Sequence, residues 1–426
     1  MIYPKLLIIS HNLYENTNNI GKTLVSLLKK WPKERICQIY LRDDQPSFQF
    51  CDSYYRILDK EVLKHKYKKK TQVGKPVEPS FKSEQDTNEE KMYYIGNKRY
   101  PLISLIRDFL WKGQSWKNSE LNEWLKKESP DLILFVPNDY ELIYPIVEYI
   151  STYLSIPVFS YYMDDAFYMA GAISLVDLIR RKKIRKRGKK LLSKYNKIFS
   201  ISPKMSEEYA KDYSIECITL MNSVSFDNVE QVEKNDNIAF SYVGNLHSNR
   251  WKALIDIGKA LRQIDEKYTI DIYTQTQLSE RIIKKMESVK NIRFMGSVKP
   301  SEINNVFNKS LFLLFVEAFD RKSVLSTRLS LSTKIPEYLA SKTPIFAYGP
   351  NNISSIEYLK NNNLAFVCSE RENLKQSLEN ALSSNIQDLV EKSYQFAYEK
   401  HNIEKNSQLF CESLCDFYKN HIKEQK

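Results

Sequence analysis

The amino-acid sequence predicts an α/β protein with two domains, each built on a parallel sheet between helices. Short apolar runs alternate with longer amphipathic stretches, and this alternation starts afresh in the second half of the chain. At 426 residues the chain is also too long for one ordinary hydrophobic core. We expect an N-terminal domain at residues 1–225, a linker at 226–238 and a C-terminal domain at 239–400.

In the first half, each expected strand is a short run rich in apolar and β-branched residues. These strands are expected at residues 6–9, 37–41, 131–136, 157–162 and 197–200. Nearly continuous runs such as DLILFV at 131–136 are typical of strands covered on both faces. Residues 61–97 are polar and lysine-rich, and we expect them to form a mobile insertion outside the core. Residues 102–111 return to a helical pattern with aromatic and basic side chains.

The second half of the chain repeats this pattern. Its strands are expected at residues 239–243, 268–274, 292–295, 311–316, 345–348 and 365–368. The amphipathic stretches between them, such as 251–264 and 279–288, are expected helices. The tail after residue 400 is helical in pattern and no strand follows it. We expect residues 401–426 to form a helix that packs back on the N-terminal domain.

Composition and missing motifs argue against several classes of protein. No stretch approaches the ~18 uninterrupted apolar residues of a membrane-spanning helix. The six cysteines are scattered without a CxxC pair, so we expect a reducing, cytoplasmic location. The sequence contains no GxGxxG, complete Walker loop, GxSxG or HExxH motif. We therefore expect neither a metal ion nor a bound cofactor.

The net charge of +12 is unevenly distributed. Residues 180–190 hold nine basic residues in eleven, and residues 64–70 form a second basic cluster. Such blocks attract an anionic membrane surface or nucleic acid, and a merely solvated helix face is the alternative. Together with residues 102–111, this tract predicts a peripheral protein at the inner face of the plasma membrane, with nucleic acid the less favoured partner. The cations expected at the contact are Arg180, Arg181, Lys182, Lys183, Arg185, Lys186 and Arg187.

The most informative segment is 332–350, which has the pattern of a polar loop, a short helix opened by a proline, and a buried strand. Ser332, Thr333 and Lys334 place two hydroxyls and a cation beside the free N–H groups of the first helical turn, which suits a diphosphate. Glu337 would repel phosphate and is better suited to accept hydrogen bonds from sugar or ribose hydroxyls. An ordinary capped surface helix is the alternative interpretation.

Other loops also follow expected strands, which is where open α/β sheets bind ligands. In one of them, Gly244 and Asn245 stand at a strand end, and a cation, Arg250, comes six residues after the glycine. Few glycines occur in this chain, so a glycine in such a turn carries weight. This loop is the second candidate for binding phosphate groups.

Two phosphate-binding loops in the second half and carboxylates in the first fit group transfer from a nucleoside diphosphate donor. Two loops of the N-terminal half are therefore candidates for the side of the site that binds the acceptor. Asp164 and Asp165 follow the expected strand at 157–162 and are candidate catalytic carboxylates, with helix capping as the alternative. The loop that follows the first strand contains Asn19 and Gly21. We expect this loop to contribute to the acceptor side of the site.

Residues 239–370 resemble the donor domain of GT-B glycosyltransferases, particularly those of the retaining family 4. The segment YVGNL at 242–246 resembles the strand and glycine loop of that family, and Arg250 stands where a phosphate-binding basic residue is expected. IRFMGSV at 292–298 resembles the strand and turn before the nucleotide-base loop. KIPEYLASKTPI at 334–345 resembles the region EAMASGKPV, with Glu337 at the ribose-binding glutamate.

This resemblance implies the GT-B fold, in which two Rossmann-like domains with parallel sheets face a central cleft. It implies metal-free, retaining transfer of a hexosyl group from a nucleotide-sugar donor. The expected acceptor is a saccharide or lipid-linked saccharide in bacterial surface polysaccharide assembly. The residues expected at the donor diphosphate are Gly244, Asn245, Arg250, Ser332, Thr333 and Lys334, and those expected at ribose or sugar hydroxyls are Glu337 and Glu317.

The sequence also departs from the family pattern. Position 329 is Leu where the family commonly has a second glutamate, and Glu317 lies further upstream than that position. Asn245 replaces the usual arginine, so the two remaining cations must carry more of the diphosphate charge. The histidine that often follows the strand at 157–162 is replaced by a pair of carboxylates. The alternative function is that of a GT-B-like protein that binds polyanions or membranes without catalysis.

Overall fold

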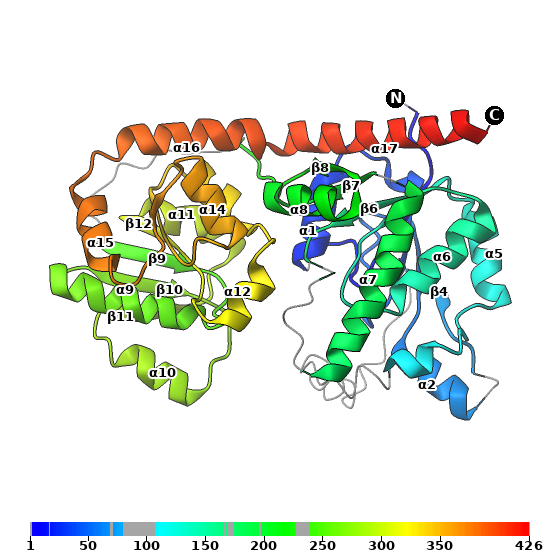
Figure 1. Cartoon of the computed structure of the whole chain (residues 1–426), viewed down its shortest axis with the longest axis horizontal. Helices are drawn as coiled ribbons and strands as arrows, with labels where there is room; N and C mark the ends of the chain where they lie inside the picture. Colours follow the sequence, from blue (N-terminus) through cyan, green and yellow to red (C-terminus); the bar gives the residue numbers. More distant parts are fainter. Residues whose placement is uncertain are drawn as a thin grey trace. The chain divides into compact units, whose positions relative to one another are not determined.

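The computed structural model describes residues 2–16, 18–68, 71–79, 107–165, 167, 174–195, 197–226 and 238–425. The contacts within the chain divide it into two domains (Figure 1). The first domain comprises Met1–Leu220 and Lys405–Lys426, and the second comprises Met221–Glu404. The prediction of two α/β domains with parallel sheets is confirmed.

The described residues of the first domain form an eight-stranded sheet in the order β4-β3-β2-β1-β5-β6-β7-β8. Neighbouring strands run parallel, except that β4 at the edge is antiparallel to β3. Every residue of β1, β5 and β6 is buried, so these strands are covered on both faces, as their apolar sequences predict. The strands are β1 (Leu6–Ile9), β2 (Ile36–Tyr40), β3 (Ser53–Arg56), β4 (Lys75–Val77), β5 (Leu132–Phe135), β6 (Val158–Tyr162), β7 (Lys197–Ser200) and β8 (Glu216–Thr219).

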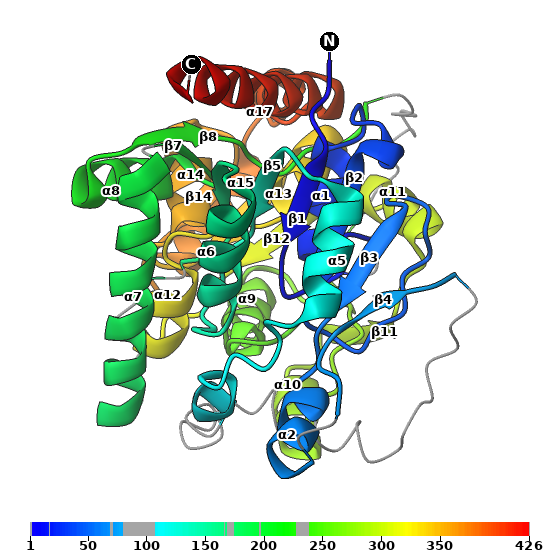
Figure 2. The same ribbon diagram turned by 90° about the vertical axis from the view of Figure 1, so that its right-hand side faces the viewer.

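Helices cover both faces of this sheet (Figure 2). Several begin at a side-chain cap, for example at Asn18, whose Oδ1 accepts from the backbone N–H of Gly21, and at Ser202, which precedes a proline at the first helical position. The helices are α1 (Asn19–Leu27), α2 (Asp59–Tyr67), α5 (Ser119–Glu128), α6 (Ile143–Leu154), α7 (Leu175–Tyr195) and α8 (Pro203–Tyr213).

The last helix of the chain, α17 (Ile403–Gln425), also belongs to the first domain. The ring of Phe410 lies 4.7 Å from that of Phe199, and the ring of Phe417 lies 4.7 Å from that of Phe159. The α17 helix therefore covers aromatic side chains that project from β6 and β7.

Part of the segment predicted to be an insertion is packed structure. Residues 59–67 form α2 and residues 75–77 form β4, and Val62, Val73 and Val77 are buried. The sequence pattern was misleading because a short amphipathic helix and an edge strand can be held by only a few apolar contacts. The remainder of the segment, residues 80–97, lies outside the described residues, as does the first part of 102–111.

The second domain contains a six-stranded sheet among its described residues, in the order β11-β10-β9-β12-β13-β14, with all neighbours parallel. Its strands are β9 (Ala239–Val243), β10 (Thr269–Tyr273), β11 (Ile292–Gly296), β12 (Phe312–Val316), β13 (Ile345–Tyr348) and β14 (Phe366–Cys368). Its helices are α9 (Arg250–Ile264), α10 (Glu280–Glu287), α11 (Ile303–Asn308), α12 (Arg321–Thr327), α13 (Lys334–Ala340), α14 (Ser354–Asn361), α15 (Leu374–Ser383) and α16 (Gln387–Lys400).

The boundary between the domains lies slightly earlier than the linker expected from the sequence. Val224 donates to His401 O at 2.8 Å and pairs with Asn402, and His401 Nδ1 lies 2.7 Å from Asn222 O. These contacts tie residues 221–225 to the second domain. Most of the expected linker, residues 227–237, lies outside the described residues.

Each sheet has one point where the chain order reverses, and such points are where open α/β sheets bind ligands. In the first domain, β1 lies between β2 and β5; in the second, β9 lies between β10 and β12. Ligand sites are therefore expected at the loops that follow the carboxyl ends of β1 and β5 in the first domain, and of β9 and β12 in the second. Within the described residues, no helix is both long enough and apolar enough to cross a bilayer.

Candidate functional site

In the second domain, four candidate residues from distant parts of the sequence meet at the reversal point of the sheet. Gly244 follows β9 and Glu317 follows β12 directly. Arg250 begins α9, and Lys334 begins α13. The structure therefore joins the two segments that the sequence singled out for phosphate binding.

Arg250 and Glu317 form a bidentate ion pair at the centre of this cluster. Arg250 Nε and Nη2 donate to Glu317 Oε2 and Oε1 at 3.1 and 2.8 Å, and Nη1 donates to Asn245 Oδ1 at 3.0 Å. Burial alone would lower the pKa of Arg250, but the nearby carboxylate of Glu317 outweighs burial and raises it. The guanidinium is therefore fixed in position and charged. Glu317, expected at sugar or ribose hydroxyls, has both oxygens on Arg250 in this structure.

Lys334 places its ammonium group beside the same pair. Its Nζ lies 3.4 Å from the hydroxyl of Tyr242 and 4.6 Å from the centroid of that ring. Lys334 forms no ion pair with any residue that the structure describes. Burial, and then the charge of Arg250, lower the pKa of Lys334 to about 7, although Glu317 and Glu337 act in the opposite direction. The cluster therefore contains a permanent cation and a second one that titrates near neutral pH.

Gly244 makes room for this ammonium group. Its φ of +150° lies in a region that L side chains rarely adopt. A Cβ atom at this position would lie 1.6 Å from Nζ and 2.2 Å from Cε of Lys334. Only glycine therefore permits the lysine to approach the backbone at the end of β9.

The other residues of the 332–337 motif lie at the start of α13. This helix begins at Lys334, so Pro336 is its third residue rather than its first. Ser332 Oγ lies 3.4 Å from the backbone nitrogen of Lys334, while Thr333 precedes the helix without a side-chain cap. Glu337 is exposed one turn after Lys334. The serine, the threonine and the glutamate therefore border the cluster without joining its ion pair.

In the first domain, a cavity of about 210 Å³ lies at the reversal point of the sheet. Its wall comes from the loops at the carboxyl ends of β1, β2, β5 and β6, together with the first turn of α1. Asp164 is the one candidate catalytic residue that reaches this cavity. The side chains with polar groups in its wall are Ser10, His11, Asn12, Arg42, Asn138, Asp139, Tyr140 and Asp164.

His11 is the most perturbed group in this cavity. Its ring lies 4.8 Å from that of Tyr140, centroid to centroid. Burial, followed by the charges of Arg107 and Arg42, lowers the pKa of His11 to about 4, so the imidazole is neutral at pH 7. Its Nδ1 is buried without a hydrogen-bond partner among the described residues. A buried polar atom of this kind calls for a partner, which a ligand hydroxyl or water in the cavity would provide.

The remaining acceptor-side candidates do not line the cavity. Asp165 accepts hydrogen bonds from Tyr209 Oη at 3.1 Å and from the backbone N–H of Phe167 at 3.2 Å, so it holds its own loop in place. Asn19 is exposed at the start of α1. A Cβ atom on Gly21 would lie 2.0 Å from Glu15 O, so this glycine serves the close packing of the loop.

The basic tract forms α7, and its cations fall into two groups. Arg180 and Arg181 are buried, with Asp177 carboxylate oxygens 3.7 and 3.0 Å from their Nε atoms. Arg187 pairs with Glu141 at 3.1 Å. These three arginines of the expected membrane contact therefore already have carboxylate partners within the domain. The exposed cations of the expected set are Lys182, Lys183, Arg185 and Lys186.

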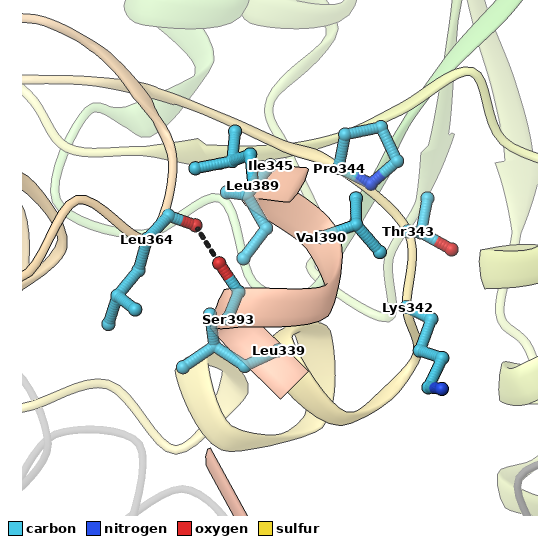
Figure 3. Close-up of a pocket in the computed structure, with 9 residues that line it drawn as sticks. All are labelled: Leu339, Lys342, Thr343, Pro344, Ile345, Leu364, Leu389, Val390 and Ser393. Atoms are coloured by element: carbon cyan, nitrogen blue, oxygen red, sulfur yellow. Dashed lines mark hydrogen bonds between the residues drawn. The ribbon is translucent and has the colours of Figure 1, made fainter. Parts of the chain in front are cut away.

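A further gap, between α13, β13 and α16, is not a substrate site. Figure 3 shows it lined mainly by apolar side chains, with Ser393 Oγ donating to Leu364 O at 3.0 Å. Its volume of about 10 Å³ is at the limit of what one water molecule needs. It reflects the packing of α16 against the sheet. Among the described residues, no group of three or more His, Cys, Asp or Glu side chains is placed to hold a metal ion.

Sequence reasoning missed several residues of both sites. Tyr242 flanks Lys334, and His11 and Arg42 line the N-terminal cavity. His11 comes two residues after the end of β1, and Arg42 comes two residues after the end of β2. A polar side chain two residues after the end of a buried strand was therefore the sequence signal for these residues. It also applies to the loop after β2, which was not among the loops singled out from the sequence.

No protein-family model matches this sequence, and no curated protein matches it either. Solved structures, in contrast, match over nearly the whole chain. Anabaena HepE in complex with UDP-glucose superimposes with a TM-score of 0.60 at 10% identity, covering 97% of this chain and 100% of HepE. The chain has the GT-B fold.

Two further structures show the same fold. The α,α-trehalose 6-phosphate synthase of Burkholderia multivorans matches with a TM-score of 0.62 at 11% identity, covering 100% of this chain and 99% of the synthase. A variant of S. aureus TarM, bound to fondaparinux, α-GlcNAc-glycerol and UDP, matches with a TM-score of 0.59 at 10% identity. It covers 97% of this chain and 99% of TarM. At such identities the likeness establishes the fold alone.

Proposed function

We propose that this protein is a glycosyltransferase that moves a sugar from a nucleotide-sugar donor to a glycan or lipid-linked glycan. The observation that carries this proposal is the meeting of Arg250 and Lys334 beside Gly244, at the reversal point of the second sheet. Two cations beside a glycine suit a diphosphate, because the missing side chain lets a ligand and the ammonium group approach the backbone. HepE and TarM, which share the fold, are bound to UDP-glucose and UDP respectively.

The residues of this cluster would act on the leaving group. Cleavage of the bond between the sugar and the diphosphate leaves negative charge on the diphosphate oxygen. Arg250 is held by Glu317 and Asn245, so its charge is fixed before the reaction begins. Oriented cations of this kind stabilise developing charge without reorganising, and a metal ion is not needed for this step. Glu337 is exposed one turn after Lys334, and we propose that it accepts hydrogen bonds from ribose or sugar hydroxyls.

The acceptor side of the proposal rests on the cavity of the first domain. Asp164 and the neutral imidazole of His11 both line it, and a carboxylate and an imidazole can each accept a proton from a hydroxyl. A glycan hydroxyl is therefore a suitable ligand for this cavity. We propose hexosyl transfer with retention of configuration and a role in bacterial surface polysaccharide assembly, as the resemblance to family 4 implies.

Donor binding is the most direct test. Thermal unfolding should be measured with UDP, GDP and TDP, for the wild type, Arg250→Ala and Arg262→Ala. The last variant is a matched control, since the exposed Glu266 is the one ion-pair partner of Arg262 among the residues that the structure describes. A nucleotide at about 100 times its dissociation constant adds ~2.7 kcal/mol of stability, or about 5 °C or more in Tm. We expect one nucleotide to stabilise the wild type and Arg262→Ala but not Arg250→Ala. The same shift in all three proteins, or none in the wild type, would refute the donor site.

Turnover is tested separately with the sugar donor that carries the preferred base. Release of nucleoside diphosphate with a glycan acceptor should depend on both Arg250 and Asp164. The anomeric configuration of the product, read by NMR, decides between retention and inversion. A protein that binds the nucleotide but never releases it with any saccharide acceptor would contradict the transferase assignment.

A further inference from the structure

The outward face of α7 combines exposed aliphatic and basic side chains. Leu175 and Ile179 are 80% and 55% exposed at the beginning of the helix. The face continues with the exposed lysines Lys182, Lys183 and Lys186. These five residues follow the spacing of one helical face, and none of them is acidic.

The opposite face of α7 is fixed to the domain. Ile184 and Leu191 are buried in the core, and Gly188 lies so close to Phe167 that a Cβ atom would be 2.2 Å from its ring. The buried Asp177 pairs with both inward arginines. The helix therefore cannot rotate its lysines inward, and the exposed charge is carried by side chains that point outward.

A second patch of the same character lies on α2. Lys64, Lys66 and Lys68 are exposed there, and Tyr67 between them is 81% exposed. Lys66 Nζ lies 4.1 Å from the ring centroid of Phe109, which is itself 60% exposed. Aromatic and lysine side chains are thus mixed on this patch, much as aliphatic and lysine side chains are on the α7 face.

Residues 107–112 lie between α2 and the inward side of α7. On one side, Arg107 pairs with Asp59 of α2 at 2.8 Å. On the other side, Asp108 and Lys112 share a cavity of about 100 Å³ with Arg187 of α7. Figures 1 and 2 both place α2 at the end of the domain from which α7 starts. The exposed residues of the two patches, both in the first domain, are here called the basic–apolar surface: Leu175, Ile179, Lys182, Lys183, Lys186, Lys64, Lys66, Tyr67, Lys68 and Phe109.

We propose that the basic–apolar surface docks the first domain on an anionic lipid bilayer. Lysines attract phosphate headgroups, and each contributes to binding near an anionic membrane. Exposed leucine, isoleucine and phenylalanine side chains enter the boundary between headgroups and acyl chains, while tyrosine lies at headgroup level. A soluble polyanion would use the lysines but would gain nothing from the aliphatic pair. The inference goes beyond the proposed function and does not depend on it, because docking needs no sugar donor.

Vesicle sedimentation with the full chain tests this docking. Binding should be compared between phosphatidylcholine vesicles and vesicles with about 30% phosphatidylglycerol. We expect binding only to the anionic vesicles, and its loss when the salt concentration is raised to about 1 M, where charges are screened over ~3 Å. Equal binding to both kinds of vesicle, or none to either, would overturn the proposal.

Matched variants separate the contribution of the lysines to vesicle binding from that of the aliphatic side chains. Lys182→Gln/Lys183→Gln/Lys186→Gln should raise the lipid concentration for half-binding about a hundredfold, at roughly fivefold per lysine. The control, Lys284→Gln/Lys290→Gln/Lys392→Gln, removes the same charge from exposed lysines of the second domain and should bind as the wild type does. If the control loses as much binding, net charge rather than this surface is responsible and the proposal fails.

Leu175→Ser/Ile179→Ser tests the aliphatic contribution. We expect at least a tenfold loss of vesicle binding, with Met295→Ser/Leu409→Ser, exposed elsewhere, as the control. Unchanged vesicle binding by Leu175→Ser/Ile179→Ser, combined with competition by soluble RNA or polyphosphate, would identify the surface as a polyanion site instead. Nucleotide-induced thermal stabilisation should be the same in all these variants, so failure of docking is distinguishable from failure of the donor site.

Discussion

Glu317 accepts two hydrogen bonds from Arg250, at 2.8 and 3.1 Å, and its carboxylate is buried. A guanidinium has five N–H donors. Two are taken by Glu317 and one by Asn245, which leaves two for a ligand. Glu317 therefore holds the cation at the reversal point of the sheet without using up its capacity to bind phosphate.

Replacing Arg250 should affect catalysis and stability by different amounts. We expect Arg250→Ala to lower turnover by ~10²-fold, the effect of losing one oriented charge donor. It should also lower the free energy of unfolding by about 3 kcal/mol, because Glu317 is left as a buried, unpaired carboxylate. The double variant Arg250→Ala/Glu317→Gln should regain much of that stability in chemical denaturation but none of the activity. Recovery of activity along with stability would show that Arg250 is only structural.

Donor affinity should fall as the pH rises, because of Lys334. Its pKa of about 7 leaves the ammonium charged below pH 7 and neutral above it. Above pH 7 the dissociation constant for the nucleotide sugar should rise by up to about tenfold per pH unit, as measured by calorimetry. Lys334→Arg, which stays charged, should give a flatter profile. An equally steep profile in this variant would assign the titration to another group.

The same lysine should destabilise the folded protein at low pH. Its ordinary pKa is 10.5, so between pH 7 and 10.5 the unfolded chain binds more protons at this position than the native one. The contribution of Lys334 to stability therefore increases with pH across this window. At pH 6, Lys334→Met should raise the free energy of unfolding by about 1 kcal/mol while abolishing donor binding. A less stable variant would contradict the lowered pKa.

Gly244→Ala should weaken donor binding more than it weakens the fold. The added Cβ strains the backbone at a φ of +150° and also meets the flexible end of Lys334, so the ammonium group must move away. We expect at least a tenfold loss of affinity for the nucleotide in calorimetry. Gly74→Ala is the control, since Gly74 also has a positive φ, +82°, but belongs to the first domain and has no lysine against it. Equal losses of affinity in both variants would point to backbone strain rather than to the lysine.

Substitutions of the neighbouring carboxylates Asp164 and Asp165 should have different effects, one on the use of the acceptor and the other on stability. Asp164 lines the cavity, whereas Asp165 accepts hydrogen bonds from Tyr209 and Phe167. We expect Asp164→Asn to lower kcat/KM for the acceptor with little change in Tm. Asp165→Asn should instead lower Tm by a few degrees, corresponding to about 1 kcal/mol for a lost hydrogen bond. The reverse pattern would move the acceptor-side role to Asp165.

Most of the buried parallel strands were predictable because continuous apolar runs allow few other structures. The strand β3 was missed although it lies inside the sheet, because its sequence SYYR is not such a run. The strands at residues 6–9, 197–200, 239–243 and 345–348 have the bounds expected from the sequence. The edge strands β4 and β8 were not predicted, since edge strands are short and only partly apolar. A strand at the edge of a sheet pairs with one neighbouring strand only. Its sequence therefore needs fewer apolar residues and is harder to recognise as a strand.

The donor cluster was partly predictable, and the part that was missed depends on tertiary contacts. Gly244, Arg250 and Lys334 were singled out from their positions after strands and at helix starts. The pairing of Glu317 with Arg250 was not foreseen, because 67 residues separate the two in the sequence and only the fold brings them together. Similarly, the sequence could not separate the inward arginines of α7 from its outward lysines without knowing which face meets Glu141 and Asp139.

The position of α17 has a consequence for how the chain is made. The first domain needs this helix over β6 and β7, yet the ribosome supplies it only after the second domain has emerged. Domains generally fold as units during synthesis. The second domain can therefore complete its fold while the first still exposes the aromatic rings of Phe159 and Phe199. Synthesis of the first domain begins before that of the second, but its core is completed later. Its exposed aromatic rings would be a binding surface for a chaperone in that interval.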